Sequence, residues 1–322
     1  MTVAIARDEW LSFVRTEYLE SYIADGGAAI KVVIDLGGSD LDLAETVAAH
    51  AADAGYLTAV VDATVSRVHM IDQVFFAVAE QIPWRETVDR VVTRLATADG
   101  LNVADGDGPL FRRIAEASKL DPQYVQLELR RKIGEKIFKN HSFVKDFRVA
   151  VTQLSTAAFG GGQEADTTFT TITDWLTGRN RAVSAVKPYQ IFSRINRSNA
   201  RHFFESALSW ICLAEWPGLV LVIDIRRVTV ARNPRDGGLY YTKSAVLDTY
   251  EVLRQYIDGT DRLVNCLIVV VADPEFLDDD PTGRGMGAYE ALKFRVFDEI
   301  RDRELANPMA ALVRLASTGV VE

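Results

Sequence analysis

Residues 30–62 constrain the fold of this chain more than any other segment. The run 30–34 is apolar and rich in β-branched residues, and it leads into a pair of glycines. An alanine-rich stretch with helical spacing, 41–54, follows and ends at a glycine. A second apolar run, 57–62, comes directly after it. A strand, a helix and a strand in this order within about thirty residues predict a parallel β-sheet.

The rest of the chain predicts a split α/β domain. Apolar runs at 219–224, 263–272 and 311–315 predict three further strands. Most of the sequence between about 70 and 216 has helical spacing instead, which predicts a large helical insertion between two strands of the sheet. We expect an N-terminal helix within residues 1–27 and a single α/β domain over 28–322. The glycine-rich stretch 159–166 predicts a disordered loop between two helices of the insertion.

The turn after the first strand has the layout of a phosphate-binding loop and lacks its residues. With the pattern G-x-x-x-x-G-K-S/T placed on 35–42, the signature positions hold Asp35, Asp40, Leu41 and Asp42. In a working loop the glycines let the backbone surround the phosphates, the lysine neutralises them and the hydroxyl binds magnesium. Leucine carries no charge, and carboxylates repel phosphate. We therefore interpret this turn as a capped helix start.

Two later strands lead to the same conclusion. The strand 219–224 ends at Asp224, where a P-loop ATPase positions magnesium, but the next residue, Ile225, cannot act as a general base. The strand 263–272 runs into Asp273, where a residue that senses the terminal phosphate is expected. The order of strands and helices therefore predicts a P-loop NTPase-like (AAA-type) parallel core. The residues at the signature positions predict that this core does not catalyse ATP hydrolysis. Its vestigial nucleotide site comprises Asp35, Gly38, Ser39, Asp40, Leu41, Asp42, Asp224, Ile225 and Asp273.

The aspartates of the predicted site also allow an alternative interpretation, a metal site. The carboxyl ends of parallel strands meet at one edge of the sheet, where three or more carboxylates could hold magnesium or calcium. The residues concerned are Asp35, Asp40, Asp42, Asp224 and Asp273. We favour the other interpretation, in which helix caps and water satisfy them, and we predict neither a metal nor a cofactor.

The formal net charge of −9 argues against a protein that mainly coats nucleic acid. A local basic patch is still compatible with this charge, and basic residues gather in 130–148 and 194–202. Most such runs are solvated helix faces, and the alternatives are a nucleic-acid backbone or an acidic partner. The patch comprises Arg130, Arg131, Lys132, Lys136, Lys139, Arg197 and Arg201.

Cellular location follows from two further observations. Cys212 and Cys266 each lie in an apolar run, which predicts buried free thiols in a cytoplasmic protein. No apolar run reaches about 18 residues and the N-terminus lacks a signal-peptide pattern, so we expect neither a membrane span nor secretion.

Several uncommon segments resemble the BrxD-like ATP-binding proteins of bacteriophage-exclusion (BREX) systems, which are AAA-type P-loop ATPases also found beside DNA helicases. The resemblance covers most of the chain and includes Gly55-Tyr56, Trp175-Leu176-Thr177-Gly178, Asn199-Ala200, residues 218–224, Asp273-Pro274-Glu275-Phe276-Leu277, Arg284-Gly285 and Tyr289-Glu290-Ala291-Leu292. It implies an AAA-type fold in a phage-defence assembly.

The functional residues of that family are mostly replaced in this chain. Leu41 replaces the phosphate-binding lysine, and Asp42 replaces the magnesium-binding hydroxyl. Ile225 replaces the catalytic glutamate and Asp273 replaces the sensor threonine, so only Asp224 matches.

We therefore predict a pseudo-ATPase, a catalytically inactive subunit or scaffold in a bacterial antiphage-defence or DNA-processing assembly. Its expected partner is an ATPase or helicase subunit of the same system, and oligomers are compatible with this function. One alternative is a working AAA-type ATPase with an unconventional site or one completed by a neighbouring subunit. The other is a DNA-binding adaptor that uses residues 130–139.

Overall fold

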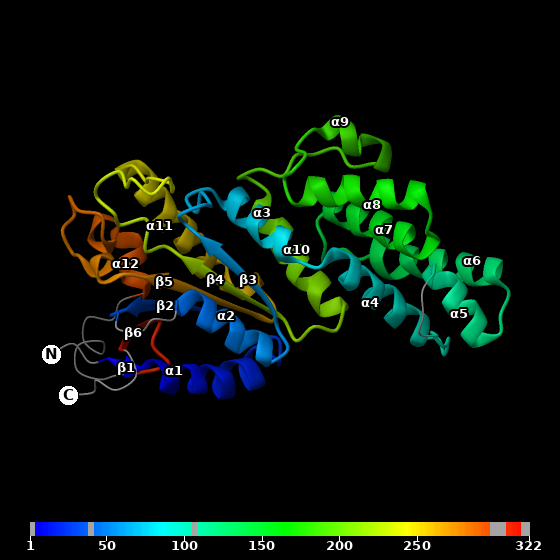
Figure 1. Cartoon of the computed structure of the whole chain (residues 1–322), viewed down its shortest axis with the longest axis horizontal. Helices are drawn as coiled ribbons and strands as arrows, with labels where there is room; N and C mark the ends of the chain where they lie inside the picture. Colours follow the sequence, from blue (N-terminus) through cyan, green and yellow to red (C-terminus); the bar gives the residue numbers. More distant parts are fainter. Residues whose placement is uncertain (1–3, 38–41, 105–107, 297–306, 317–322) are drawn as a thin grey trace. The chain divides into compact units, whose positions relative to one another are not determined.

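The computed structural model describes residues 4–37, 42–104, 108–296 and 307–316, and the chain forms two compact units (Figure 1). The first unit combines Met1–Gln81 with Trp216–Glu322 and holds the sheet. The regular elements in the described part of the second unit, Ile82–Glu215, are all helices. The N- and C-terminal parts of the chain thus build one α/β unit, and the helical unit is inserted between them.

The α/β unit is built on a parallel sheet, which confirms the fold class that the apolar runs predict. The strands are β1 (Ile5–Ala6), β2 (Ala28–Asp35), β3 (Leu57–Asp62), β4 (Leu219–Asp224), β5 (Cys266–Ala272) and β6 (Leu312–Ala316). Their order is β1-β6-β2-β5-β4-β3, and all pairs run parallel. Every residue of β4 and β5 is buried, as expected for central strands covered on both faces.

Helices of the α/β unit bury the faces of this sheet (Figure 1). They are α1 (Arg7–Phe13), which continues as a π-helix (Val14–Tyr22), α2 (Leu43–Asp53), α3 (Ile71–Gln81), α11 (Lys243–Asp258) and α12 (Glu290–Val296), with short 3-10 turns at Thr260–Arg262, Pro274–Leu277 and Met286–Ala288. Side chains of α1 and α2, among them Trp10 and Val47, form one buried cluster with Val222 and Val269 of the central strands.

The N-terminal segment belongs to the sheet and is not a separate element, which corrects the predicted division at residue 27. Ile5 of β1 pairs with Leu315 of β6. The Tyr56 hydroxyl donates a hydrogen bond to the Leu19 carbonyl at 2.5 Å, which fastens the π-helix to the end of α2. These contacts place the first helix in the core of the α/β unit.

The helical unit packs around buried aromatic side chains. Its helices are α4 (Trp84–Thr97), α5 (Leu110–Ser118), α6 (Pro122–Ile133) with a π-helical continuation (Gly134–Phe138), α7 (Lys145–Gly160), α8 (Gln163–Leu176), α9 (Val183–Val186) with a 3-10 turn (Lys187–Tyr189), and α10 (Ala200–Leu213). Phe147 and Trp175 both meet Phe203 edge-on, and Phe143 packs on Trp210. Such contacts hold the helices together by apolar burial and ring geometry.

Two predicted boundaries in this region are wrong. The insertion begins at Ile82 and not near residue 70, because α3 is fastened to the sheet by Gln81, whose side chain bonds the Val60 N–H and C=O at 2.9 Å each. The stretch predicted as a disordered loop is mostly helical, because α7 ends at Gly160 and α8 begins at Gln163, with only two residues between them. Gly161 and Gly162, with φ of +66° and +93°, make the turn, and such angles favour glycine.

Candidate functional site

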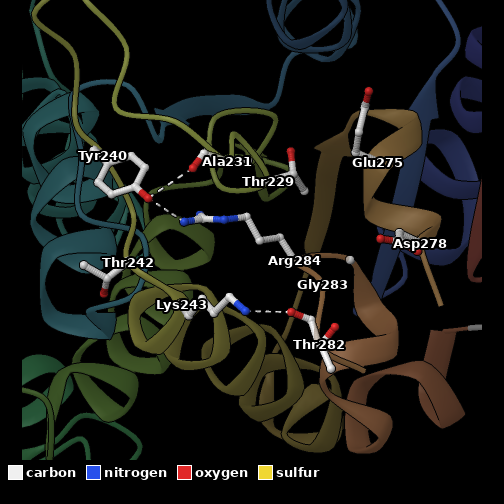
Figure 2. A pocket seen from close by; sticks show the side chains of 11 residues that line it. Thr229, Ala231, Tyr240, Thr242, Lys243, Glu275, Asp278, Thr282, Gly283 and Arg284 are labelled. Atoms are coloured by element: carbon white, nitrogen blue, oxygen red, sulfur yellow. Dashed lines mark hydrogen bonds between the residues drawn. The ribbon is translucent and has the colours of Figure 1, made fainter. Parts of the chain in front are cut away.

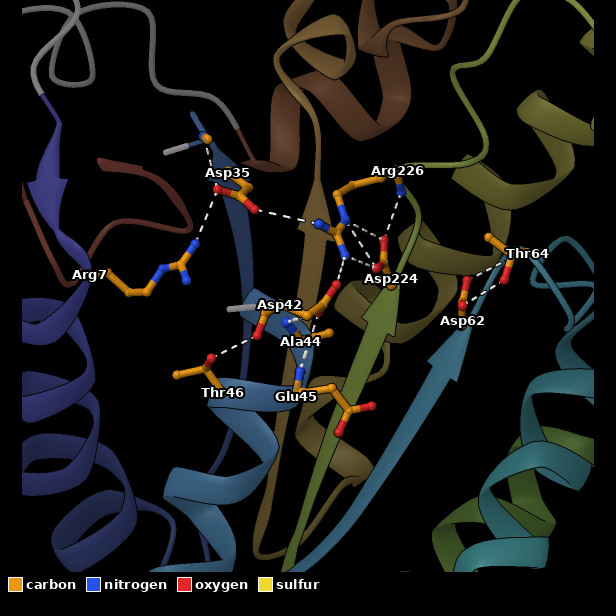
Figure 3. A network of polar contacts seen from close by, with 11 residues as sticks. Arg7, Asp35, Asp42, Ala44, Glu45, Thr46, Asp62, Thr64, Asp224 and Arg226 are labelled. Atoms are coloured by element: carbon orange, nitrogen blue, oxygen red, sulfur yellow. Dashed lines mark hydrogen bonds and ion pairs between the residues drawn. The ribbon is translucent and has the colours of Figure 1, made fainter. Parts of the chain in front are cut away.

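Three aspartates end three strands at the sheet edge where α/β proteins bind ligands. Asp35 ends β2, Asp62 ends β3 and Asp224 ends β4 (Figure 3). Asp62 accepts hydrogen bonds from the backbone and hydroxyl of Thr64 at 2.6 Å each, so it closes its own turn. Of the predicted site, Gly38, Ser39, Asp40 and Leu41 lie outside the described residues.

Arg226 joins the other acids of this edge. Its Nε lies 3.0 Å from both oxygens of Asp224, and its Nη2 donates to Oδ2 of the same carboxylate at 2.5 Å. The same Nη2 donates to Asp42 at 2.7 Å, and Nη1 lies 3.5 Å from Asp35. Figure 3 shows the guanidinium between the three carboxylates. A single arginine therefore neutralises charge from three separate parts of the chain.

A second arginine approaches the same group from the N-terminal segment. Arg7 Nη2 lies 3.4 Å from Asp35 Oδ1, and the side chains are 6% and 13% exposed. Asp35 also accepts a hydrogen bond from the Gly37 N–H at 3.1 Å. The end of β2 thus faces two guanidinium groups, Arg7 and Arg226.

Asp42 caps α2, in agreement with the interpretation of this turn as a helix start. Its Oδ1 accepts hydrogen bonds from the Ala44 and Glu45 N–H groups at 2.8 and 3.4 Å. Burial alone would raise the pKa of Asp42. The hydrogen bond and charge of Arg226, together with the two backbone donors, outweigh burial and hold this pKa below its usual range. The carboxylate is therefore held ionised by the helix and the arginine.

The two remaining positions of the predicted site do not join this cluster. Ile225 is fully buried in the apolar core. Asp273 accepts a 2.5 Å hydrogen bond from the Thr229 hydroxyl, and its other oxygen caps the turn Pro274–Leu277 through the Phe276 N–H. Burial raises the pKa of Asp273, against the effect of the Thr229 hydrogen bond. This carboxyl therefore orders the loop after β5.

The described acids of this edge do not fit the magnesium ion of magnesium-ATP. Magnesium needs free oxygen ligands, whereas the described carboxylates of this edge bind arginine, cap a helix or, for Asp62, close a turn. Within the described ranges, no group of three or more histidine, cysteine or acidic side chains is placed to hold a metal ion. The alternative of a five-acid metal site also fails for Asp273, which lies with Thr229 instead.

The predicted basic patch divides in the structure. Arg131 pairs with Glu128 and Glu135 at 2.5 and 2.8 Å, and Lys132 is only 5% exposed and pairs with Asp99. Arg201 lies 3.5 Å from Glu205. The exposed members of the patch are Arg130, Arg131, Lys136, Lys139 and Arg197. Arg131 and Lys132 therefore contribute mainly to local ion pairs and packing.

A hollow of about 630 Å³ lies between the loops that follow β4 and β5 (Figure 2). Its cationic groups are bonded to the loops themselves. Lys243 Nζ donates to the Thr282 carbonyl at 2.8 Å, and Arg284 donates to the Tyr240 hydroxyl at 2.7 Å and the Tyr241 carbonyl at 2.8 Å. These bonds give Arg284 a structural role in joining the two loops.

Sequence reasoning missed both arginines of the acid cluster. A signal for Arg226 was present, because it follows the last residue of an apolar strand by two positions and so had to lie at the same sheet edge as Asp224. No comparable signal marked Arg7, whose approach to Asp35 depends on the pairing of β1 with β6.

The all-parallel sheet, with a turn and helix after β2 and an aspartate at the end of β4, defines a P-loop NTPase-like core. The family model described as "BREX system ATP-binding protein BrxC/D" matches residues 109–319, and the chain belongs to this family. The match includes Asp224, Ile225 and Asp273 and begins after the turn that follows β2. Family membership implies a role in phage defence.

The other comparisons add no relative. Neither the curated proteins nor the solved structures contain a match to this chain. None of the helices in the described ranges combines the length and apolar character that a membrane crossing needs.

Proposed function

We propose that this chain is a pseudo-ATPase, a subunit of a BREX phage-defence assembly that keeps the ATPase frame and does not hydrolyse ATP. The observation that carries the proposal is the guanidinium of Arg226 between Asp35, Asp42 and Asp224. In a working P-loop ATPase the magnesium ion and the phosphates lie at this edge. Here an internal cation takes the place of the metal.

Binding of magnesium-ATP would require this cluster to be taken apart. The side chains of Asp35 and Asp224 are only 13% and 12% exposed, so loss of their arginine partner would leave two poorly solvated charges. Breaking a buried pair costs about 3–5 kcal/mol, and the 31% exposure of Arg226 reduces this cost. Ile225, next to Asp224, supplies no base to activate water, so the opened site would still lack a catalytic group.

The function of such a subunit depends on what its surfaces bind. AAA-type domains act through contacts between subunits, so the partner we propose is an ATPase or helicase of the same system. Membership in the BREX family supports an assembly of this kind. An inactive copy there would set the geometry of an active neighbour or limit its turnover.

Phosphate release by the assembled system tests this proposal. The full chain is purified alone and together with the system components that co-purify with it, and ATP turnover is measured for wild type and Asp224→Asn. We expect no ATP turnover from the isolated chain. We expect the assembly that contains wild type and the assembly that contains Asp224→Asn to turn over ATP equally. Turnover by the isolated chain, or an assembly that loses its activity with Asp224→Asn while still forming, would support the working or neighbour-completed ATPase instead.

A further inference from the structure

The positive charge of this acidic protein is concentrated in the helical unit. Residues 82–215 hold 19 Lys and Arg against 15 Asp and Glu, whereas the α/β unit holds 17 against 30. The stretch 175–204 carries no acidic residue at all and contains Arg179, Arg181, Lys187, Arg194, Arg197 and Arg201. An acid-free basic stretch of this length within one unit is an electrostatic footprint of phosphate binding.

The fold brings part of this stretch beside the beginning of α7. Asp146, in the first turn of α7, accepts hydrogen bonds from the Phe192 N–H at 3.3 Å, the Ser193 N–H at 2.8 Å and the Ser193 hydroxyl at 2.5 Å. The Val144 N–H donates to the Ser206 hydroxyl of α10 at 3.0 Å. Lys145 and Arg194, the sequence neighbours of Asp146 and Ser193, therefore belong to one surface.

Hydrogen bonds also order the segments that present the cations. Arg148 of α7 donates to the Asn140 carbonyl at 3.4 Å, which holds the turn after Lys139 against the helix. Asn199 donates to the Arg194 carbonyl at 2.9 Å and accepts from the Asn196 N–H at 2.8 Å, which closes the segment before α10. We define the basic surface as Lys139, Lys145, Arg194 and Arg197, all of them exposed.

The acids near this surface in sequence have partners of their own, and Glu135 pairs with Arg131 at 2.8 Å. Asp146 is 9% exposed, and its three donors all come from the segment that it holds. Glu205 lies 3.5 Å from Arg201. The four exposed cations therefore act together on an approaching anion.

Two half-exposed phenylalanines belong to the same segments. Phe138 is 49% exposed and immediately precedes Lys139, and Phe192 is 51% exposed and lies two positions before Arg194. Aromatic rings among cations are the combination that binds single-stranded nucleic acid, because the cations contact phosphates and the rings stack on unpaired bases. An acidic protein partner would use the cations without a need for exposed rings.

We propose that the basic surface of the helical unit binds single-stranded nucleic acid, with Phe192 stacking on a base and Arg194 and Arg197 contacting phosphates. This inference does not depend on the nucleotide site, which lies in the other unit. The basic surface shares Lys139 with the patch at residues 130–139 and does not include Arg131 and Lys132, which are engaged elsewhere.

Fluorescence anisotropy with the full chain tests the proposal. The probes are labelled oligothymidine and oligouridine of about 20 nucleotides and a duplex of equal length, between about 50 and 200 mM salt. We expect Arg194→Glu with Arg197→Glu to weaken binding of the single strands at least tenfold and to reduce the salt slope by roughly 1–2. Phe192→Ala is expected to weaken it roughly tenfold without changing the slope.

A matched pair of substitutions controls for net charge. Lys119→Glu with Arg112→Glu makes the same charge change at exposed positions of α5 and its C-cap, and we expect its affinity to stay within about twofold of wild type. Thermal melting checks that all variants fold. The proposal is overturned if wild type binds neither single strand, if both double variants lose affinity equally, or if the duplex binds as tightly as the single strands. Tighter binding of polyglutamate than of oligothymidine would overturn it in favour of an acidic protein partner.

Discussion

Arg226 turns back on Asp224, so that its Nε lies 3.0 Å from both oxygens of the carboxylate at the end of β4. The same guanidinium donates to Asp42, which is 184 positions away in sequence and caps α2. The strand that would position magnesium and the helix that would cradle phosphate are thus joined by a side chain of the protein itself. Arg226 thus contacts all three of Asp35, Asp42 and Asp224.

Loss of Arg226 should lower the free energy of unfolding. Arg226→Ala leaves Asp35, Asp42 and Asp224 facing one another with Arg7 as the nearest described cation. Because the arginine is 31% exposed, we expect a loss of about 1–3 kcal/mol, below the cost for a fully buried pair. Urea denaturation measures the free energy of unfolding. Arg226→Lys keeps the positive charge and loses the planar guanidinium, so its stability should lie between those of wild type and Arg226→Ala. An unchanged midpoint for Arg226→Ala would contradict the role given to this residue.

The same substitution should create a response to divalent cations. Carboxylates released from Arg226 are oxygen ligands of the kind that magnesium and calcium prefer. We expect millimolar calcium or magnesium to raise the melting temperature of Arg226→Ala and to leave wild type unchanged at matched ionic strength. If both proteins respond equally, the guanidinium does not stand in for a metal ion.

Stability in acid should depend on Asp42. Its pKa is below the usual range in the folded protein, so its contribution is complete above the unfolded value of about 3.9 and is lost as the pH falls through the folded value. Asp42→Asn removes this contribution and can still cap α2. We expect urea midpoints of wild type above those of the variant at pH 7, with the difference narrowing below about pH 4. A constant difference across this range would show that the charge of Asp42 adds nothing.

Gly218 should not tolerate a side chain. Its φ is +155°, and an added Cβ would lie 2.0 Å from the Asn265 carbonyl oxygen, where the start of β4 meets the start of β5. We expect Gly218→Ala to cost at least 1–3 kcal/mol, roughly the cost of overpacking. Gly134→Ala is the control, because Gly134 is helical with no atom within 4 Å of the added Cβ, and it should stabilise by about 0.4–1 kcal/mol. Equal melting temperatures for both variants would contradict this geometry.

The sheet could be predicted because its central strands are continuous apolar runs. Leu219–Asp224 is buried at every position, so composition alone identified it. β1 escaped prediction because two residues carry no periodic signal, and its pairing with β6 spans the length of the chain. The end of α7 was misread because Gly160 stays helical, and only the next two glycines turn the chain.

For the candidate site, the sequence predicted the acids and not their partner. Asp35 and Asp224 follow strands and so fall at one edge of the sheet. Whether such acids hold a metal, water or a cation of the protein depends on the rotamer of one long side chain, Arg226, and on a loop that local patterns do not determine. Lys132 does not contribute to the predicted basic patch for a related reason, because it is buried beside Asp99.

Isothermal titration of the full-length chain with magnesium-ATP tests the central claim most directly. We predict no binding heat at millimolar nucleotide for wild type, because Arg226 holds the carboxylates of the site and neither a lysine nor a hydroxyl occupies its place in the phosphate-loop pattern. Binding at micromolar affinity, lost on Asp224→Asn in a variant that melts like wild type, would show that the site still holds nucleotide and would contradict the claim.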